Sequence, residues 1–287
     1  MTRYMAKRKR KKGPTMAQLA DRHMLYQEAV QCTEFEIEFY EDRFKDLRGK
    51  RRRPMIMRED FCGTAMFAAD WCKSNAKRHA IGVDLCSDTL KWGMENIIKP
   101  AGSSVNSRVT LLNDNVLEVV TEKVDFTCAM NFSYCVFKSR DLLRDYFKNV
   151  LRGLKSDGLF FLDLMGGTAT IDLNEEYKYL EESQATYVWE HESFNPINND
   201  IRCYIHFEFD DGSRMDKAFV YEWRLWSLPE LHEILLEAGF SSVHIFWEEF
   251  VEDDDPKNEF MEGTGNYREV TCVDQQESWL AYIVAAV

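Results

Sequence analysis

Long apolar runs, paired cysteines and the lysine-containing loop of nucleoside-triphosphate sites are all missing from this chain of 287 residues. The longest apolar run, 279–287, has nine residues, whereas a membrane-spanning helix needs about 20. No apolar segment follows the basic N-terminus, so the pattern of a secretory signal is absent. The eight cysteines form no CxxC pair and no cluster with zinc-ligand spacing. We therefore expect a reduced, cytoplasmic protein without a metal site and with no membrane partner.

Charge is unevenly distributed along the chain. The formal net charge is −13, yet residues 1–14 hold seven Lys and Arg residues and no acidic one. This segment is typical of a disordered, solvated tail, and the functional alternatives are a nuclear-import signal or a weak tether to nucleic acid. Because the remaining chain is acidic and repels a phosphate backbone, nucleic acid is a disfavoured partner and a small molecule a favoured one.

From residue 54 onward, short apolar segments alternate with helical patterns. The expected strands are Met55–Arg58, Ala80–Leu85, Val109–Leu112, Val124–Met130, Leu159–Met165, Val243–Trp247 and Trp279–Val284. The expected helices are 66–71, 87–97 with Ser87 as N-cap, 140–154, and 228–238 with Ser227 as N-cap. Short buried strands separated by helices are typical of a parallel sheet covered on both faces. The sequence thus predicts a doubly wound α/β fold with a seven-stranded, mostly parallel sheet.

The remaining segments complete the expected organisation. Residues 1–14 form the tail, and residues 15–53 a helical lid segment with one long amphipathic helix from Thr15. Residues 54–167 and 227–287 form the two parts of the α/β core, the second with an acidic loop at 248–260. Between them, residues 168–226 contain aromatic-rich strand segments separated by Asn, Asp and Gly turns. This pattern predicts an inserted antiparallel β meander.

The segment 58–65, REDFCGTA, joins the first expected strand to the first helix of the core. Open α/β sheets bind their ligands at the carboxyl ends of the strands, and small residues there let backbone N–H groups approach a ligand. Asp84 ends the second strand, 21 residues after Gly63. A carboxylate at this spacing can accept hydrogen bonds from ribose hydroxyls. The alternative is that Asp84 caps the following helix.

On these residues the chain resembles the class I S-adenosylmethionine-dependent methyltransferases. In that family an acidic residue precedes a Gly-x-Gly-x-Gly loop, and the corresponding positions here are Glu59, Phe61, Gly63 and Ala65. The resemblance covers residues 55–167 and the closing helix and strands. A dinucleotide would need a loop that cradles a pyrophosphate, whereas S-adenosylmethionine carries no phosphate, so a loop with fewer glycines is compatible with it.

The resemblance implies S-adenosylmethionine as cofactor and a set of contact residues. The implied cofactor-binding residues are Glu59, Phe61, Cys62, Gly63, Thr64, Asp84, Leu85, Asp114, Asn115 and Asn131. Asp114 matches the acid that contacts adenine, and Asn131 matches the position that lines the methyl-transfer site, with Tyr134 as a second catalytic candidate. The structural alternatives are an ion pair of Glu59 with a nearby arginine, a turn at Asp114 and a core position for Tyr134.

The meander supplies the expected substrate wall. On an alternating strand, Arg202, Tyr204 and His206 share one face, which is polar enough to line a pocket. The alternative is that this is the solvent face of a half-buried sheet. His191, Glu222, Trp223 and Arg224 are further polar or aromatic candidates in the same segment.

These expectations combine into one function and two rivals. The function is transfer of a methyl group from S-adenosylmethionine to a small-molecule acceptor, in which the protein aligns the reacting atoms and excludes water. The first rival is a protein or RNA methyltransferase guided by the basic tail. The second is an inactive, cofactor-binding scaffold or regulatory subunit.

Overall fold

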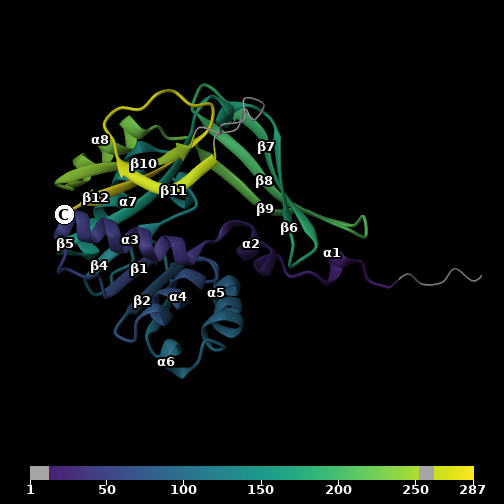
Figure 1. The fold of residues 1–287 in the computed structure, drawn as a ribbon, viewed down its shortest axis with the longest axis horizontal. Helices are drawn as coiled ribbons and strands as arrows, with labels where there is room; N and C mark the ends of the chain where they lie inside the picture. The colour runs from purple at the N-terminus through teal and green to yellow at the C-terminus, as the bar shows by residue number, and fades with distance from the viewer. Residues whose placement is uncertain (1–12, 252–261) are drawn as a thin grey trace, which may run out of the picture.

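The computed structural model describes residues 13–251 and 262–287, which fold around two β-sheets (Figure 1). The larger sheet has the strand order β11-β10-β12-β5-β4-β1-β2-β3. Its strands are β1 (Ile56–Asp60), β2 (His79–Asp84), β3 (Val109–Asn113), β4 (Val124–Ala129), β5 (Leu154–Gly166), β10 (Ser242–Val251), β11 (Glu262–Glu269) and β12 (Trp279–Ala286). The five strands from β5 to β3 are parallel, and β12, β10 and β11 are added antiparallel.

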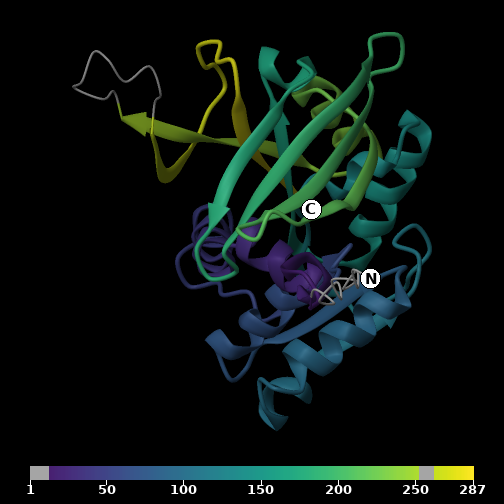
Figure 2. The same ribbon diagram turned by 90° about the vertical axis from the view of Figure 1, so that its right-hand side faces the viewer.

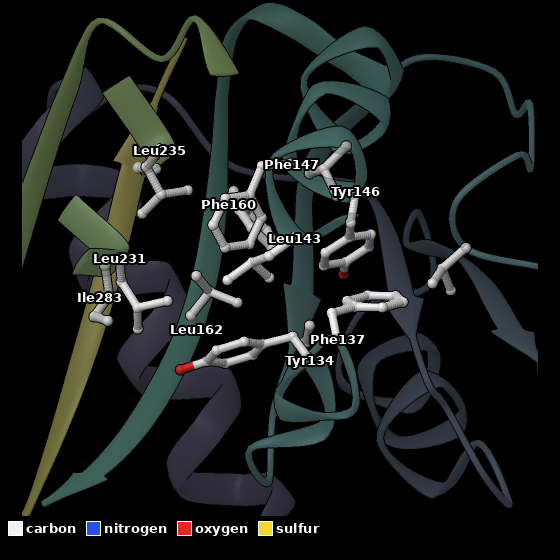
Figure 3. Close-up of a cluster of buried hydrophobic side chains, with 14 of the residues drawn as sticks. Tyr134, Phe137, Leu143, Tyr146, Phe147, Phe160, Leu162, Leu231, Leu235 and Ile283 are labelled. Atoms are coloured by element: carbon white, nitrogen blue, oxygen red, sulfur yellow. The ribbon is translucent and has the colours of Figure 1, made fainter. Parts of the chain in front are cut away.

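Helices cover both faces of this sheet. They are α4 (Met66–Ser74), α5 (Ser87–Gly93), the π-helical turn η1 (Met94–Ile98), α6 (Ser103–Asn106), the 3₁₀ turn η2 (Ser133–Val136), α7 (Arg140–Gly153) and α8 (Leu228–Ala238). Alternation along β5 divides the core. Phe160 and Leu162 pack with α7 and α8, as Figure 3 shows, while Phe161 packs with α4 and with α3 (Thr33–Arg48) on the other face. The predicted doubly wound α/β fold is confirmed.

The sheet has eight strands, one more than the seven expected. Strand β11 has the polar, glycine-containing sequence EGTGNYRE, which offers no apolar alternation to indicate a strand. It forms because the exposed edge of β10 supplies a partner for its backbone groups. Strand β10 itself continues to Val251, so the start of the expected acidic loop is strand, and residues 252–260 lie outside the described part of the chain.

The N-terminal segment forms three helices where one was expected. They are α1 (Met16–Leu19), α2 (Arg22–Val30) and α3 (Thr33–Arg48). Ala20 is extended, and the Asp21 carboxylate caps α2 by accepting from the backbone N–H groups of His23 and Met24. The apolar period continued through these breaks, so periodicity alone could not reveal them. Most of the basic tail, residues 1–12, lies outside the described residues.

Residues 168–226 form the expected antiparallel insertion, a second sheet with the order β6-β7-β8-β9. After the 3₁₀ turn η3 (Thr168–Ile171) come β6 (Glu175–Leu180), β7 (Ala185–Asn195), β8 (Asp200–Phe209) and β9 (Arg214–Arg224). Figure 2 shows these long strands as a layer of their own beside the central sheet, with α2 close to them. Leu25 and Ala29 of α2 pack against Ile205 and Phe207 of β8, so α2 joins the two layers.

Two predicted helix caps have different outcomes. Ser227 caps α8 and forms a capping box with Glu230, as expected for an N-cap serine. Ser87, in contrast, is already the first residue of α5, and the N-cap position is taken by Cys86 without a side-chain hydrogen bond. The cap prediction at Ser87 is therefore wrong by one residue, because the turn after β2 is fixed by Asp84, whose carboxylate accepts from the N–H of Cys86.

Gly93 at the end of α5 allows a close contact with the loop after β1. A Cβ atom at this position would lie 2.2 Å from the carbonyl oxygen of Thr64. Alanine normally stabilises a helix over glycine by about 1 kcal/mol. We predict the opposite sign for Gly93→Ala, a loss of about 1–3 kcal/mol in the free energy of unfolding measured in urea, because backbone must shift. Lys91→Ala, exposed on the same helix, should change it by less than about 0.5 kcal/mol.

Candidate functional site

The loop after β1 takes the left-handed backbone conformation at alternate residues. The φ angles are +58° at Phe61, +53° at Gly63 and +57° at Ala65. These are the three positions at which the resembling family carries glycine, and only glycine adopts this conformation without cost. Phe61 and Ala65 keep it through packing: the ring of Phe61 lies 5.7 Å from that of Tyr146, and Ala65 is fully buried.

Small residues also bring neighbouring elements against this loop. A Cβ atom on Gly82 of β2 would lie 2.9 Å from the Cys62 sulfur, so the loop packs directly on the second strand. The hydroxyl oxygen of Thr64 accepts a hydrogen bond of 2.8 Å from the Gln27 side chain of α2. The side chain of Cys62 therefore fixes the loop to β2, and that of Thr64 fixes it to α2.

Asp84 links the ends of β1 and β2. One carboxylate oxygen accepts from the backbone N–H of Gly63 at 2.9 Å, and the other from that of Cys86 at 2.8 Å. The bond to Cys86 belongs to the turn and not to a helix cap, since the N-cap position is Cys86 itself. Asp84 thus lies beside the loop at the carboxyl edge of the sheet, where the sequence placed it.

Glu59 pairs with no arginine among the residues that the structure describes. Its carboxylate accepts from the backbone N–H of Ala68 in the first turn of α4, at 3.2 Å. Its neighbour Arg58 instead forms a buried ion pair of 2.8 Å with Asp60. Burial raises the pKa of Glu59 well above its usual range, and the nearby carboxylate of Glu36 adds to this effect.

Seven of the ten expected cofactor-binding residues line the cavities described below, and Leu85, Asp114 and Asn115 do not. Leu85 is 70% exposed, Asp114 is exposed, and Asn115 is partly exposed at the start of the turn after β3. Asp114 is tied to the site by its backbone N–H, which donates to the carbonyl of Asp84, and its carboxylate accepts from Asn115. These residues lie at the rim of the site, beside the end of β2.

Asn131 follows β4 in a left-handed conformation, as does Phe132, with φ angles of +55° and +56°. The buried carboxylate of Asp163 on β5 accepts from both of their backbone N–H groups, at 2.8 and 2.9 Å. Burial raises the pKa of Asp163 to about 7, although these two hydrogen bonds act against the rise. Asp163 therefore fixes the backbone that presents Asn131.

Tyr134 was expected at the reaction centre, but the structure places it in the core. Its side chain is fully buried, and its hydroxyl donates to the backbone carbonyl of Asp163 at 2.6 Å. Figure 3 shows its ring among the apolar side chains of α7 and β5. It lines neither of the two cavities described below. Because its hydroxyl is buried and hydrogen-bonded to a backbone carbonyl, Tyr134 cannot contact a substrate.

Two cavities meet at Asn131. The first, here called the edge cavity, has a volume of about 350 Å³ and is lined by Glu59, the loop residues 60–64, Asp84 and residues of α2 and α3. The second, here called the aromatic cavity, has about 440 Å³ and lies between the insertion and the ends of β5 and β12. Both volumes lie in the range of small-molecule sites. Their shared walls are Tyr26, Asn131, Tyr221 and Trp223.

The insertion lines the aromatic cavity with the face opposite to the expected one. Pairing in the second sheet puts Trp189 opposite Ile205 on the face that points into the cavity. Arg202, Tyr204 and His206 lie on the other face and line neither of these cavities. There Arg202 pairs with Glu222, and His206 lies between Glu190 and Asp216. The polar face is thus occupied by its own ion pairs, and the prediction of a polar substrate wall is wrong.

Sequence reasoning missed the contribution of the N-terminal helices. Tyr26, Gln31 and Glu36 line the edge cavity, although only the general role of a lid was expected for this segment. It also missed Glu176 on β6, which with Trp189 and His191 lines the aromatic cavity. Period-2 alternation along β7 was the available signal, since Tyr187, Trp189 and His191 share one face.

Glu36 on α3 is a further carboxyl group of the edge cavity with a raised pKa. Burial and the carboxylate of Asp163 raise the pKa of Glu36 to about 8.

Comparison with known proteins gives the class of the fold. No family model and no curated protein sequence matches the chain. An S-adenosylmethionine-dependent methyltransferase from Clostridium acetobutylicum is 15% identical, with 92% of this chain and 97% of that one covered and a TM-score of 0.63. CalS10, an amino pentose methyltransferase from Micromonospora echinaspora, is 13% identical, with 92% and 95% covered and a TM-score of 0.62.

A third similar structure is the sugar N-methyltransferase KedS8 from Streptoalloteichus, 14% identical, with 99% of both chains covered and a TM-score of 0.59. The three likenesses extend over nearly the whole of each chain, insertion included. The chain therefore has the class I S-adenosylmethionine-dependent methyltransferase fold. No helix of the described residues is long and apolar enough to cross a membrane.

We predict that the stability of the protein falls between pH 6.5 and 8. The folded protein keeps a proton on Glu36 and Asp163 at pH values where the unfolded chain has already lost it, because their pKa values rise from 4.5 and 3.8 to about 8 and about 7. The free energy of unfolding therefore falls as the folded state loses these two protons, by about 2 kcal/mol over this range. Urea unfolding at pH 6.5 and at pH 8 measures this difference in the free energy of unfolding. Glu36→Gln should make the difference smaller. An unchanged difference in that variant would contradict the raised pKa of Glu36.

Proposed function

We propose that the chain is an S-adenosylmethionine-dependent methyltransferase that methylates a small molecule held in the aromatic cavity. The observation that carries this proposal is the meeting of two cavities at Asn131, one along the loop after β1 and one under the inserted sheet. A methyltransferase needs this arrangement, because donor and acceptor must approach each other in line from two sides.

The edge cavity fits the cofactor. The Asp84 carboxylate lies beside the loop, where ribose hydroxyls would donate to it. The space above Gly63 is open, since a Cβ atom there would meet no other atom within 4 Å. The side-chain oxygen of Gln31 is buried against this cavity without a hydrogen-bond partner in the described part of the protein. The site thus offers acceptors for a ligand rich in N–H and O–H donors.

S-adenosylmethionine would supply an activated methyl group on a sulfonium. The protein's task is then to position both reactants and to exclude water. Asn131 is fixed at the junction by Asp163, and Tyr26, Tyr221 and Trp223 form the common wall. Aromatic faces suit this place, since they exclude water and attract the positive charge of a sulfonium.

The walls of the aromatic cavity favour an amine as acceptor. They contain the carboxylate of Glu176 and the rings of Trp189 and Trp223, and no Lys or Arg among the described residues. Such a wall attracts a cation and repels an acid. Two of the similar proteins are an amino pentose methyltransferase and a sugar N-methyltransferase. The cavity volume of about 440 Å³ lies in the range of small-molecule sites and supports a small acceptor over a protein or an RNA.

We predict that Asp84→Asn weakens S-adenosylmethionine binding at least about tenfold, because a charge-assisted bond to a hydroxyl is lost and the loop bond to Gly63 is weakened. Calorimetric titration with S-adenosylmethionine measures the affinity, and circular dichroism checks the fold. Asp88→Asn, exposed on the first turn of α5, is the matched control and should bind normally. Unchanged affinity in Asp84→Asn would contradict the assignment of Asp84 to the S-adenosylmethionine site.

We predict that amines are methylated and that Trp189→Leu raises the acceptor KM about tenfold or more, with unchanged affinity for S-adenosylmethionine. Trp189 lines the aromatic cavity only, so its loss removes an acceptor contact and spares the cofactor. Formation of S-adenosylhomocysteine is followed with glucosamine and other amines, and with glucose as the hydroxyl-only comparison. Tyr177→Leu, exposed on the opposite face of the sheet, is the control. Equal turnover of glucose and glucosamine would contradict an amine acceptor.

A further inference from the structure

Two acceptor groups of the edge cavity come from the segment that runs from the C-cap of α2, Gln31, to the first turn of α3, which contains Glu36; this segment is here called the α2–α3 turn. The side-chain oxygen of Gln31 is buried and has no hydrogen-bond partner, and the carboxylate of Glu36 forms no hydrogen bond or ion pair within the described residues. Both side chains line the edge cavity. A buried acceptor without a partner costs about 1–3 kcal/mol, so the Gln31 oxygen, together with the half-buried carboxyl of Glu36 in the same cavity lining, indicates a ligand with N–H donors.

Helix α2 is held in the position that aims Gln31 at the cavity. Gln27, one turn earlier on the same face, donates to the hydroxyl of Thr64 in the loop after β1. At the start of the helix, Asp21 accepts from the indole N–H of Trp92 on α5 at 2.8 Å. At its end, Lys178 of β6 donates to the carbonyl of Ala29 at 2.8 Å. These contacts tie α2 to both layers.

Glu36 belongs to the end of the cavity that lies away from Asp84. Its helix α3 packs on β5, where the rings of Tyr40 and Phe161 lie 4.5 Å apart, two residues before the Asp163 that binds the N–H of Asn131. The mutual effects of Glu36, Glu59 and Asp163 on their pKa values agree with this position. His23, in contrast, stacks near Trp92 of α5 with ring centroids 4.9 Å apart, on the Asp84 side. The unpartnered carboxylate is thus at the Glu59–Asn131 end.

A cofactor with its ribose on Asp84 places its amino-acid part toward this end. The amino group there is an ammonium with three N–H donors, and carboxylate and amide oxygens are acceptors suited to it. We propose that Gln31 and Glu36 bind the ammonium group of the methionyl moiety, so that the α2–α3 turn completes the cofactor site. This assignment rests on the proposed function and adds two residues to its site.

The ionisation of Glu36 couples this contact to pH. In the free protein its carboxyl is protonated near neutral pH, since its pKa is about 8. A bound ammonium favours the carboxylate and lowers this pKa, so binding releases a proton below pH 8. The titratable groups around Glu36 are Glu59 on β1, Cys128 on β4, Asp163 on β5, Tyr282 on β12, Tyr26 on α2 and Tyr40 on α3.

The test compares ligands with and without the amino-acid part. The purified full chain and its variants Gln31→Leu and Glu36→Gln are titrated calorimetrically with S-adenosylmethionine, S-adenosylhomocysteine and 5′-methylthioadenosine, which lacks the ammonium. Both variants should bind the first two at least about fivefold more weakly and methylthioadenosine as the wild type does. Glu38→Gln, which removes an exposed carboxylate of the same helix, should bind all three normally.

Two further readouts separate binding from a structural role. Gln31→Leu removes an unpartnered buried oxygen, so the free protein should unfold at the same urea concentration or a higher one while its affinity falls. Titrations at pH 7 in buffers of different ionisation enthalpy should show proton release for the wild type and less for Glu36→Gln.

Three results would overturn the proposal. The first is wild-type affinity for S-adenosylhomocysteine in both variants, and the second is an equal loss for methylthioadenosine. The third is a loss for S-adenosylmethionine alone, which would place Glu36 at the sulfonium and not at the ammonium. If the wild type itself binds neither S-adenosylmethionine nor S-adenosylhomocysteine, the proposed function fails as well, so the two failures are distinguishable.

Discussion

The carboxylate of Asp163 holds together the part of the molecule on which both cavities depend. It accepts from the backbone N–H groups of Asn131 and Phe132, two consecutive residues in the left-handed conformation. Each such residue costs about 1–2 kcal/mol, and hydrogen bonds to a charged acceptor return about as much. The reversal they make lets Asn131 face two cavities. Tyr134 supports it from the core through the Asp163 carbonyl.

The N-terminal helices give the molecule a second constraint. Helix α3 packs Phe39 and Tyr40 on the central sheet, and α2 packs Leu25 on the inserted sheet. The turn between them therefore crosses the opening between the layers. Because its neighbours on both sides are fixed, this turn can keep polar acceptors buried that a free loop would turn toward water. The same segment thus contributes to the walls of both cavities.

The sequence was sufficient to predict those parts of the site that depend on local structure. The strand–loop–helix pattern around Gly63 and the position of Asp84 at the end of β2 follow from short-range apolar patterning and turn chemistry. The prediction from the sequence failed where contacts between distant segments determine the structure. The capped break at Asp21 lies inside an unbroken apolar period, and Gln31 and Glu36 reach the site only because α2 and α3 fold back over it.

The inserted sheet shows why alternation gives the two faces of a strand but not their roles. The polar face of β8 resembled a substrate wall, yet His206 on that face is only 1% exposed, buried between Glu190 and Asp216. A buried polar group must be paired, so a face can be polar and buried and still be closed to ligands. The opposite face carries aromatic rings, and these line the aromatic cavity between the inserted sheet and the ends of β5 and β12.

The shared wall of the two cavities has a consequence for the proposed chemistry. Tyr26, Tyr221 and Trp223 would contact both reactants, so each ligand completes the surface that the other meets. An amine that attacks a sulfonium carries positive charge from one molecule to the other, and aromatic faces stabilise such a charge on either side without binding water. Burial raises the pKa of Glu59 and of Glu36, which favours their neutral forms, so the aromatic faces and not these carboxyl groups stabilise the moving charge. Positioning is thus provided by packing that the fold needs in any case. An amine that binds as an ammonium has to release a proton before it attacks, because the nitrogen lone pair forms the new bond to the methyl carbon.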